Sequence, residues 1–190
     1  PAIITCDPAW EGDDELVIGM RQGLMFKILE VMPKNDNDIL VANKVARYED
    51  QYKAAAVIVD GGYGTGIVSA GRTMGRDWQI VFFSEAAPDS GFVNIRAYMW
   101  SQMGKWLAEG GAIPPDHQLY EELISPETVP RMDGKILLES KADMKKRNLP
   151  SPNKADSLAL SFAREILQPQ SAADRYQAPR VKEHDPYAEM

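Results

Sequence analysis

The sequence has very little cysteine and histidine. Its 190 residues include one cysteine, Cys6, and two histidines, His117 and His184. A lone cysteine excludes an intramolecular disulfide and fits a reducing compartment such as the cytosol. The two histidines lack the spacing of metal ligands, so we assign neither a role. A disulfide framework is therefore excluded as the basis of the fold.

Three further absences narrow the class of protein. No apolar run approaches the length that crosses a bilayer, and the N-terminus lacks a signal-peptide pattern, so we expect no membrane association. The formal net charge of −7 argues against nucleic-acid binding through overall charge, although it leaves room for a local basic groove. The pattern G-x-x-x-x-G-K-[ST] is absent, which excludes a P-loop ATPase from this chain.

The remaining composition is that of an ordinary globular domain. Hydrophobic residues make up 44% and charged residues 26% of the chain, whose length suits one domain with a real core. We predict this domain over residues 1–168. Residues 169–190 are polar and contain proline without periodicity, so we predict a flexible tail there. Because the chain begins directly on a predicted core strand at Pro1, we expect that it is a domain excised from a longer protein.

The most informative stretch is the apolar run at residues 54–59. Its β-branched residues predict a strand that is buried on both faces, as central parallel strands are. The run ends in Asp60 and a glycine-rich turn at 61–66. Residues 2–6 form a second, mostly apolar run, which is followed directly by Asp7. Because sites in open α/β sheets collect at the carboxyl ends of the strands, the two aspartates indicate a site at that edge.

The rest of the chain predicts a mixed α/β fold. Asp36, Asn94 and Ser151 are the expected caps of three helices, the last with Pro152 in its first turn. The predicted order is three strands, a helix, a strand, a helix, a strand and then helices. That is the element order of the ribonuclease H-like fold, a mixed central sheet flanked by helices. The predicted strands are 2–6, 15–22, 24–32, 54–60 and 78–83, with weak strands at 124–129 and 135–139, and the predicted helices are 37–53, 64–75, 95–109, 116–123, 140–148 and 152–166.

Three aspartates are the main candidates for chemistry: Asp7, Asp60 and Asp156, the last lying one turn into the final helix. Converging carboxylates repel one another and therefore need bound cations. Oxygen ligands select hard ions such as Mg²⁺ or Mn²⁺, and two such ions can activate water and stabilise the leaving oxygen in phosphodiester cleavage. A plainer interpretation makes these residues turn formers and a solvated helix residue. The order of the elements favours the catalytic interpretation.

Three segments resemble the acidic motifs in the nuclease domain of tailed-phage terminase large subunits. They are residues 4–9, 57–66 and 151–158, and residues 139–147 are similar to the basic segment ahead of the last motif. The resemblance covers residues 1–168 in order and with compatible spacing. It implies a DNA endonuclease that cuts concatemeric viral DNA during ATP-driven genome packaging.

By that resemblance Asp7, Asp60 and Asp156 are the catalytic metal ligands, and the cofactor is Mg²⁺ or Mn²⁺, with two ions. The implied partners are double-stranded DNA, the terminase ATPase domain, which this chain lacks, the small terminase subunit and the portal. The implied location is the host cytoplasm. Two positions depart from the family pattern: Lys154, where an arginine or another polar residue is common, and Ser157, which replaces the commoner alanine. Neither departure changes a proposed ligand.

A dense basic run lies beside the last acidic motif. Its position favours contact with phosphates, although a charge run is often only a solvated face. Arg131 and Lys135 lie just upstream, and Asp13 and Asp14 could supply an outer-shell carboxylate or simply lead into the predicted hairpin. The predicted DNA-binding residues are Lys141, Lys145, Lys146, Arg147 and Lys154.

Several alternatives remain open at this point. The glycine-rich stretch 61–66 could cradle a phosphate, but it lacks the P-loop lysine, and its glycines better suit a close approach of backbone and substrate to Asp60. Trp10 could border a cleft, whereas the other tryptophans look like core. The rival functions are a Holliday-junction resolvase or another ribonuclease H-like nuclease, and a non-catalytic domain that docks on the portal or capsid.

Overall fold

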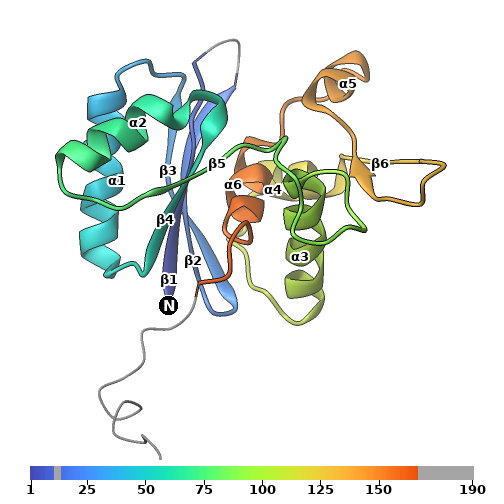
Figure 1. The fold of residues 1–190 in the computed structure, drawn as a ribbon, viewed down its shortest axis with the longest axis horizontal. Helices are drawn as coiled ribbons and strands as arrows, with labels where there is room; N and C mark the ends of the chain where they lie inside the picture. The colour runs from blue at the N-terminus through green and yellow to red at the C-terminus, as the bar shows by residue number, and fades with distance from the viewer. Residues whose placement is uncertain (11–13, 167–190) are drawn as a thin grey trace, which may run out of the picture.

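The structure is a computed structural model, and it describes residues 1–10 and 14–166. Asp13 and the predicted tail at 169–190 lie outside the described residues. A five-stranded sheet stands between two layers of helices (Figure 1). Its strands are β1 (Ala2–Asp7), β2 (Glu15–Gln22), β3 (Met25–Pro33), β4 (Ala56–Asp60) and β5 (Gln79–Val81), in the spatial order β3-β2-β1-β4-β5.

The sheet is mixed, as the sequence predicts. Strands β1, β4 and β5 are parallel to one another, while β2 pairs antiparallel with both β1 and β3. The parallel strands are joined through helices because a parallel connection must cross over the sheet. The carboxyl ends of β1 and β4 therefore lie side by side at one edge of the sheet.

Helices cover both faces of the sheet. On one side lie α1 (Asp38–Tyr52) and α2 (Gly61–Thr73), and on the other lie α3 (Ile95–Ala108), α4 (His117–Ile124) and α6 (Asn153–Leu160) (Figure 1). The small hairpin β6 (Thr128–Val129) and β7 (Leu137–Leu138) and the short helix α5 (Lys141–Lys146) extend from the second layer. No helix among the described residues has the length and hydropathy needed to span a bilayer.

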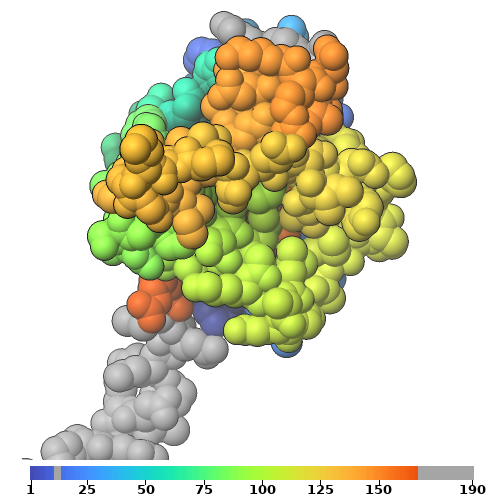
Figure 2. Space-filling view, turned by 90° about the vertical axis from the view of Figure 1, so that its right-hand side faces the viewer, coloured from blue at the N-terminus to red at the C-terminus, as the bar shows by residue number. Residues whose placement is uncertain are grey.

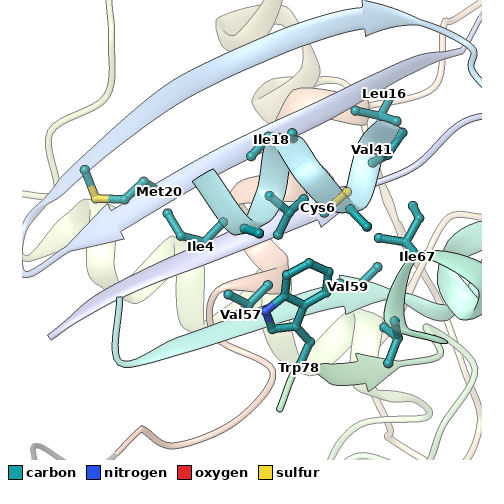
Figure 3. Close-up of a cluster of buried hydrophobic side chains, with 14 of the residues drawn as sticks. Ile4, Cys6, Leu16, Ile18, Met20, Val41, Val57, Val59, Ile67 and Trp78 are labelled. Carbon is teal, nitrogen blue, oxygen red and sulfur yellow. The ribbon is translucent and has the colours of Figure 1, made fainter. Parts of the chain in front are cut away.

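The side chains of β1 alternate between two apolar cores. Ile4 and Cys6 pack toward α1 and α2, in the cluster drawn in Figure 3, whereas Ile3 packs toward α3 and α6. Successive residues of a strand point to opposite faces, so Asp7 shares the face of Ile3. By the same rule, Asp60 shares the face of Ile58, two residues before it. Both aspartates therefore face the layer that contains α6.

Helices α1, α3, α4 and α5 lie within two residues of their predicted limits, although Asn37 caps α1 in place of Asp36. Helices α2 and α6 differ more. Helix α2 begins at Gly61, not at Gly64, so the glycine-rich stretch is the first part of a helix rather than a turn. A Cβ atom on Gly64 would lie 2.4 Å from Cγ1 of Val59, which shows that this glycine lets α2 pack against β4. Helix α6 ends at Leu160, short of residue 166, and it has no side-chain cap of its own.

Candidate active site

The register of the central strands brings two carboxylates together. Strands β1 and β4 pair with Cys6 opposite Val59, so the next residues, Asp7 and Asp60, are neighbours at the edge of the sheet. Their exposed fractions are 2% and 9%. Burial raises the pKa of Asp7 well above its usual value, and the nearby Asp60 and Asp156 add to the rise against the effect of Lys141. The pair is thus an acidic cluster that favours bound protons or cations.

Asp60 also begins a helix. Its Oδ1 accepts a hydrogen bond of 3.2 Å from the backbone N–H of Gly62, which makes Asp60 the N-cap of α2. Burial raises the pKa of Asp60, and the Gly62 N–H opposes that rise. The carboxylate therefore occupies the helix N-terminus where a phosphate would bind in a phosphate-cradling loop.

Asp156 reaches the same edge from α6, which packs across β1 and β2. The hydroxyl oxygens of Thr5 and Ser157 lie 3.0 Å apart in the core and join α6 to β1. A Cβ atom on Gly19 would lie 2.9 Å from the Ser157 hydroxyl oxygen, so a glycine on β2 lets α6 approach closely. Asp156 itself has an exposed fraction of 0%. The alternative interpretation, in which Asp156 is a solvated residue on the helix surface, is therefore wrong.

Two residues of α3 hold the Asp156 carboxylate in place. Arg96 donates from Nε to Oδ1 at 3.1 Å, and Trp100 donates from Nε1 to the same oxygen at 2.8 Å. Arg96 also donates to the backbone carbonyl of Glu139 at 2.8 Å. Burial alone would raise the pKa of Asp156, but Arg96 and Lys141 lower it below its usual value. Asp156 is thus ionised and fixed in orientation.

Lys141 links the carboxylates. Its Nζ lies 3.3 Å from Oδ2 of Asp156 and 4.0 Å from Oδ2 of Asp7. Burial would lower the pKa of Lys141, but Asp7, Asp156 and Asp60 together raise it above its usual value. Lys141 therefore carries a permanent positive charge in the middle of the acidic cluster.

One carboxylate oxygen of the cluster is suited to binding a metal ion. Oδ2 of Asp7 is buried and lacks a hydrogen-bond partner, an arrangement that costs free energy unless another group satisfies the oxygen. Oxygen donors of this kind suit Mg²⁺ or Mn²⁺. Within the described residues, no group of three His, Cys, Asp or Glu side chains is arranged to hold a metal ion, and Oδ1 of Asp156 accepts hydrogen bonds from Arg96 and Trp100. Asp7 and Asp60 are therefore the oxygens that fit a divalent cation directly.

A cleft opens in front of Asp60. It has a volume of about 430 Å³, and Lys141 and Lys145 of α5 line one side. Trp10 and Tyr63 line it as well, which places Trp10 at the border of the cleft as predicted. A neighbouring hollow of about 660 Å³ shares Asp14, Lys145 and Ser151 with the cleft. The cleft and this hollow are therefore adjacent, and Lys145 of α5 lines both.

The residues of the predicted basic run differ in their partners and exposure. Lys146 pairs with Asp143 at 2.7 Å, and Arg147 pairs with Glu127 at 2.8 Å. Lys154 has an exposed fraction of 7% and pairs with Asp116, so its ammonium group is turned inward. Lys141 belongs to the carboxylate cluster. Lys145 lines the cleft, and α5, which carries it, forms the orange block at the top of Figure 2.

Sequence reasoning missed one further buried carboxylate, Glu122 of α4. Its Oε2 accepts a hydrogen bond of 2.9 Å from the backbone N–H of Ala155 at the start of α6. Burial raises the pKa of Glu122 to about 7 against these hydrogen bonds. Glu122, which lies on another helix, therefore caps the start of α6. The cap predicted from the sequence was Ser151, whose hydroxyl has no hydrogen-bond partner in the described structure. Only a contact between distant segments could reveal this role.

Comparison with solved structures identifies the fold. No protein-family model and no curated protein matches the chain. The nuclease domain of the large terminase subunit gp2 of bacterial virus Sf6 matches with a TM-score of 0.65 and 21% identity, over 85% of this chain and 87% of that one. The large terminase nuclease of thermophilic phage G20c with bound magnesium gives 0.59 and 18%, over 86% and 80%. The nuclease domain of Thermus phage P74-26 gives 0.60 and 18%, over 85% and 77%.

The chain therefore has the α/β, ribonuclease H-like fold of phage terminase nuclease domains, which confirms the predicted fold class and the resemblance seen in the sequence. At these identities the likeness is one of fold.

Proposed function

We propose that this chain is the nuclease part of a phage terminase large subunit and that it cuts double-stranded DNA with Mg²⁺ or Mn²⁺. The observation that carries the proposal is the buried pair Asp7 and Asp60, with one orphaned carboxylate oxygen, behind a cleft with a cationic side. The shared fold supports it, as do the manganese and magnesium named for the Sf6 and G20c domains.

In this proposal Asp7 and Asp60 hold two divalent ions. Asp156 is the third carboxylate of the metal site. Bound there, such ions lower the pKa of water and stabilise the leaving oxygen of a phosphodiester. Arg96 and Trp100 fix the orientation of Asp156. Asp7 and Asp60 would both be ionised while they hold a metal ion, because a carboxylate binds a cation in its deprotonated form.

The cations of the cleft have separate roles. Lys141, held between the carboxylates, offsets part of their negative charge, which would otherwise repel the phosphate. Lys145, on the cleft side of α5, is placed to contact a phosphate next to the one that is cut. Lys145 is the residue of the predicted basic run after Lys141 for which we propose this contact. The other three, Lys146, Arg147 and Lys154, each have a carboxylate partner.

The wider assignment follows the family resemblance. The ATPase domain, the small terminase subunit and the portal are proposed partners, and the host cytoplasm is the proposed location. Preferential cutting of four-way junctions over plain duplex would instead favour the resolvase alternative.

The proposal is tested by metal-dependent cutting and metal-dependent stability. Mn²⁺ should let the purified chain cut supercoiled plasmid, EDTA should abolish cutting, and Mn²⁺ should raise the melting temperature because it binds only the native state. Asp60→Asn should lower cutting at least about 100-fold, since changes that only support a ligand already cost 10–100-fold. The matched control is Asp50→Asn on α1, across the sheet. An unchanged Mn²⁺ shift in Asp60→Asn would remove Asp60 from the metal site.

A further inference from the structure

The cleft has an aromatic side that metal-dependent hydrolysis does not require. Trp10 and Tyr63 stack with ring centroids 5.4 Å apart and an interplanar angle of 20°. Their exposed fractions are 41% and 39%, so the pair is not enclosed in the core. Both rings line the same cavity as Asp60. Large exposed aromatic rings at a site are costly in water unless a ligand covers them.

The positions of the two rings follow from the strands that carry the aspartates. Trp10 comes three residues after Asp7, and Tyr63 comes three residues after Asp60, in the first turn of α2. The aromatic pair is therefore held by the same two chain segments as the carboxylate pair. Lys141 and Lys145 line the cavity from α5. The cleft thus combines cations and carboxylates with an aromatic surface.

A nucleotide has the matching chemistry. Its phosphate is anionic, and its base is flat, with apolar faces that stack on aromatic rings. In a duplex, neighbouring base pairs cover both faces of each base, so an internal base can stack on a protein ring only after it leaves the helix. A cleft that holds a phosphate at Asp60 and presents rings beside it therefore suits an unpaired nucleotide.

Resting on the nuclease function proposed above, we propose that Trp10 and Tyr63 bind an unstacked nucleobase next to the phosphate that is cut. The substrate strand is then locally unpaired when it occupies the cleft. Bubbles, mismatches and single strands bind this site more tightly than perfect duplex, and the preference depends on the bases rather than on the backbone.

Binding can be measured through Trp10, the exposed tryptophan among the four in the chain, with Ca²⁺ as a metal that permits binding. A short oligothymidylate should quench the tryptophan emission, and the same backbone with abasic residues should not. Trp10→Leu should abolish the quenching and weaken oligothymidylate binding about 5- to 100-fold by fluorescence anisotropy, while perfect duplex binding changes less than about twofold. Trp10→Phe, which keeps an aromatic ring, should retain most of the affinity.

The control is Tyr120→Leu, which removes an exposed ring of α4 that lines a separate hollow beside Pro114. It should leave oligothymidylate binding unchanged. Equal quenching by the abasic strand, or an equal loss of single-strand and duplex affinity in Trp10→Leu, would overturn the nucleobase site and leave the nuclease function standing. Failure of the wild-type chain to bind any DNA would overturn the proposed function itself.

Discussion

The buried residues on the two faces of the sheet differ in composition. On the side of α1 and α2 the buried cluster is apolar, and neither helix contributes a buried polar residue. On the side of α3, α4 and α6 the apolar cluster is interrupted by buried Arg96, Glu122, Asp156 and Ser157. Both faces use the same strands, whose alternating residues assign each side chain to one face. The buried core on the side of α1 and α2 is therefore apolar, whereas the core on the other side also contains buried charged and polar groups.

The difference shows where buried charge is tolerated. Two buried cations on the second face have carboxylate partners from other elements: Arg96 of α3 has Asp156 of α6, and Lys154 of α6 has Asp116 before α4. A buried ion pair of this kind adds little net stability, but loss of one partner is costly. The second face should therefore be more sensitive to single polar substitutions than the first.

The largest expected difference between the two faces is in the loss of stability when one arginine is replaced on each side of the sheet, in two separate variants. Arg96→Met leaves the Asp156 carboxylate buried without its main partner, so the free energy of unfolding should fall by about 3–5 kcal/mol. Arg76→Met removes surface pairs with Asp50 and Glu49 and should cost at most about 1 kcal/mol. Urea unfolding in EDTA gives both values.

A second substitution checks the cause of the Arg96 effect. Asp156→Asn removes the buried charge that has lost its arginine partner, so the double variant with Arg96→Met should regain at least half of the lost stability. A double variant that is less stable than Arg96→Met would mean that packing, rather than charge, explains the loss.

The next effect concerns the pH dependence of stability. Glu122 has its pKa raised from 4.5 to about 7 by burial, so the native state binds its proton more tightly than the unfolded state does. Its contribution to stability is full below about pH 4.5 and is lost as the pH rises to about 7, by at most about 3 kcal/mol. Glu122→Gln should remove this slope between pH 5 and pH 7, as measured by urea unfolding at each pH.

The matched control for Glu122 is its neighbour Glu121, which is exposed on the same helix. Glu121→Gln should leave the slope of the wild-type chain unchanged. An identical pH slope in wild type and Glu122→Gln would show that the carboxyl group is already ionised at low pH in the native state.

The smallest effect belongs to the apolar face. Ile67→Val on α2 removes one buried methyl group and should lower the free energy of unfolding by about 0.5–1.5 kcal/mol. The rise in melting temperature caused by saturating Mn²⁺ should equal that of the wild-type chain. A reduced Mn²⁺ shift in Ile67→Val would show that the two faces are coupled, and the contrast drawn between them would fail.

Much of the fold was predictable because it rests on local patterns. The apolar runs that end in Asp7 and Asp60 specify parallel central strands, and the hairpin around Gly23 follows from its two flanking runs. The Asn94 cap predicted the start of α3 correctly, whereas the Asp36 cap predicted for α1 is wrong, because Asn37 caps that helix. The first turn of α2 was misjudged because glycines were taken as a turn, whereas packing against Val59 requires one of them inside the helix.

The surroundings of the site were less accessible to sequence reasoning. Asp156 could be identified as a candidate, but its partners Arg96 and Trp100 lie about 60 residues upstream, and only the packing of α3 on α6 brings them to it. Their spacing of four residues on one helix face was an available signal, since it aligns a cation with an indole N–H. The pairing of Lys146, Arg147 and Lys154 with carboxylates was not visible in the basic run itself.

The contact between Thr5 and Ser157 has a consequence for the order of folding. The two hydroxyl groups are separated by 152 positions in the chain, so the helix that carries Asp156 can dock only after nearly the whole domain has been made. During synthesis the apolar face can assemble first from early segments, whereas contacts of such long range form late. A ribosome-bound chain therefore lacks Asp156 at this edge of the sheet until residues 153–160 have emerged from the ribosome.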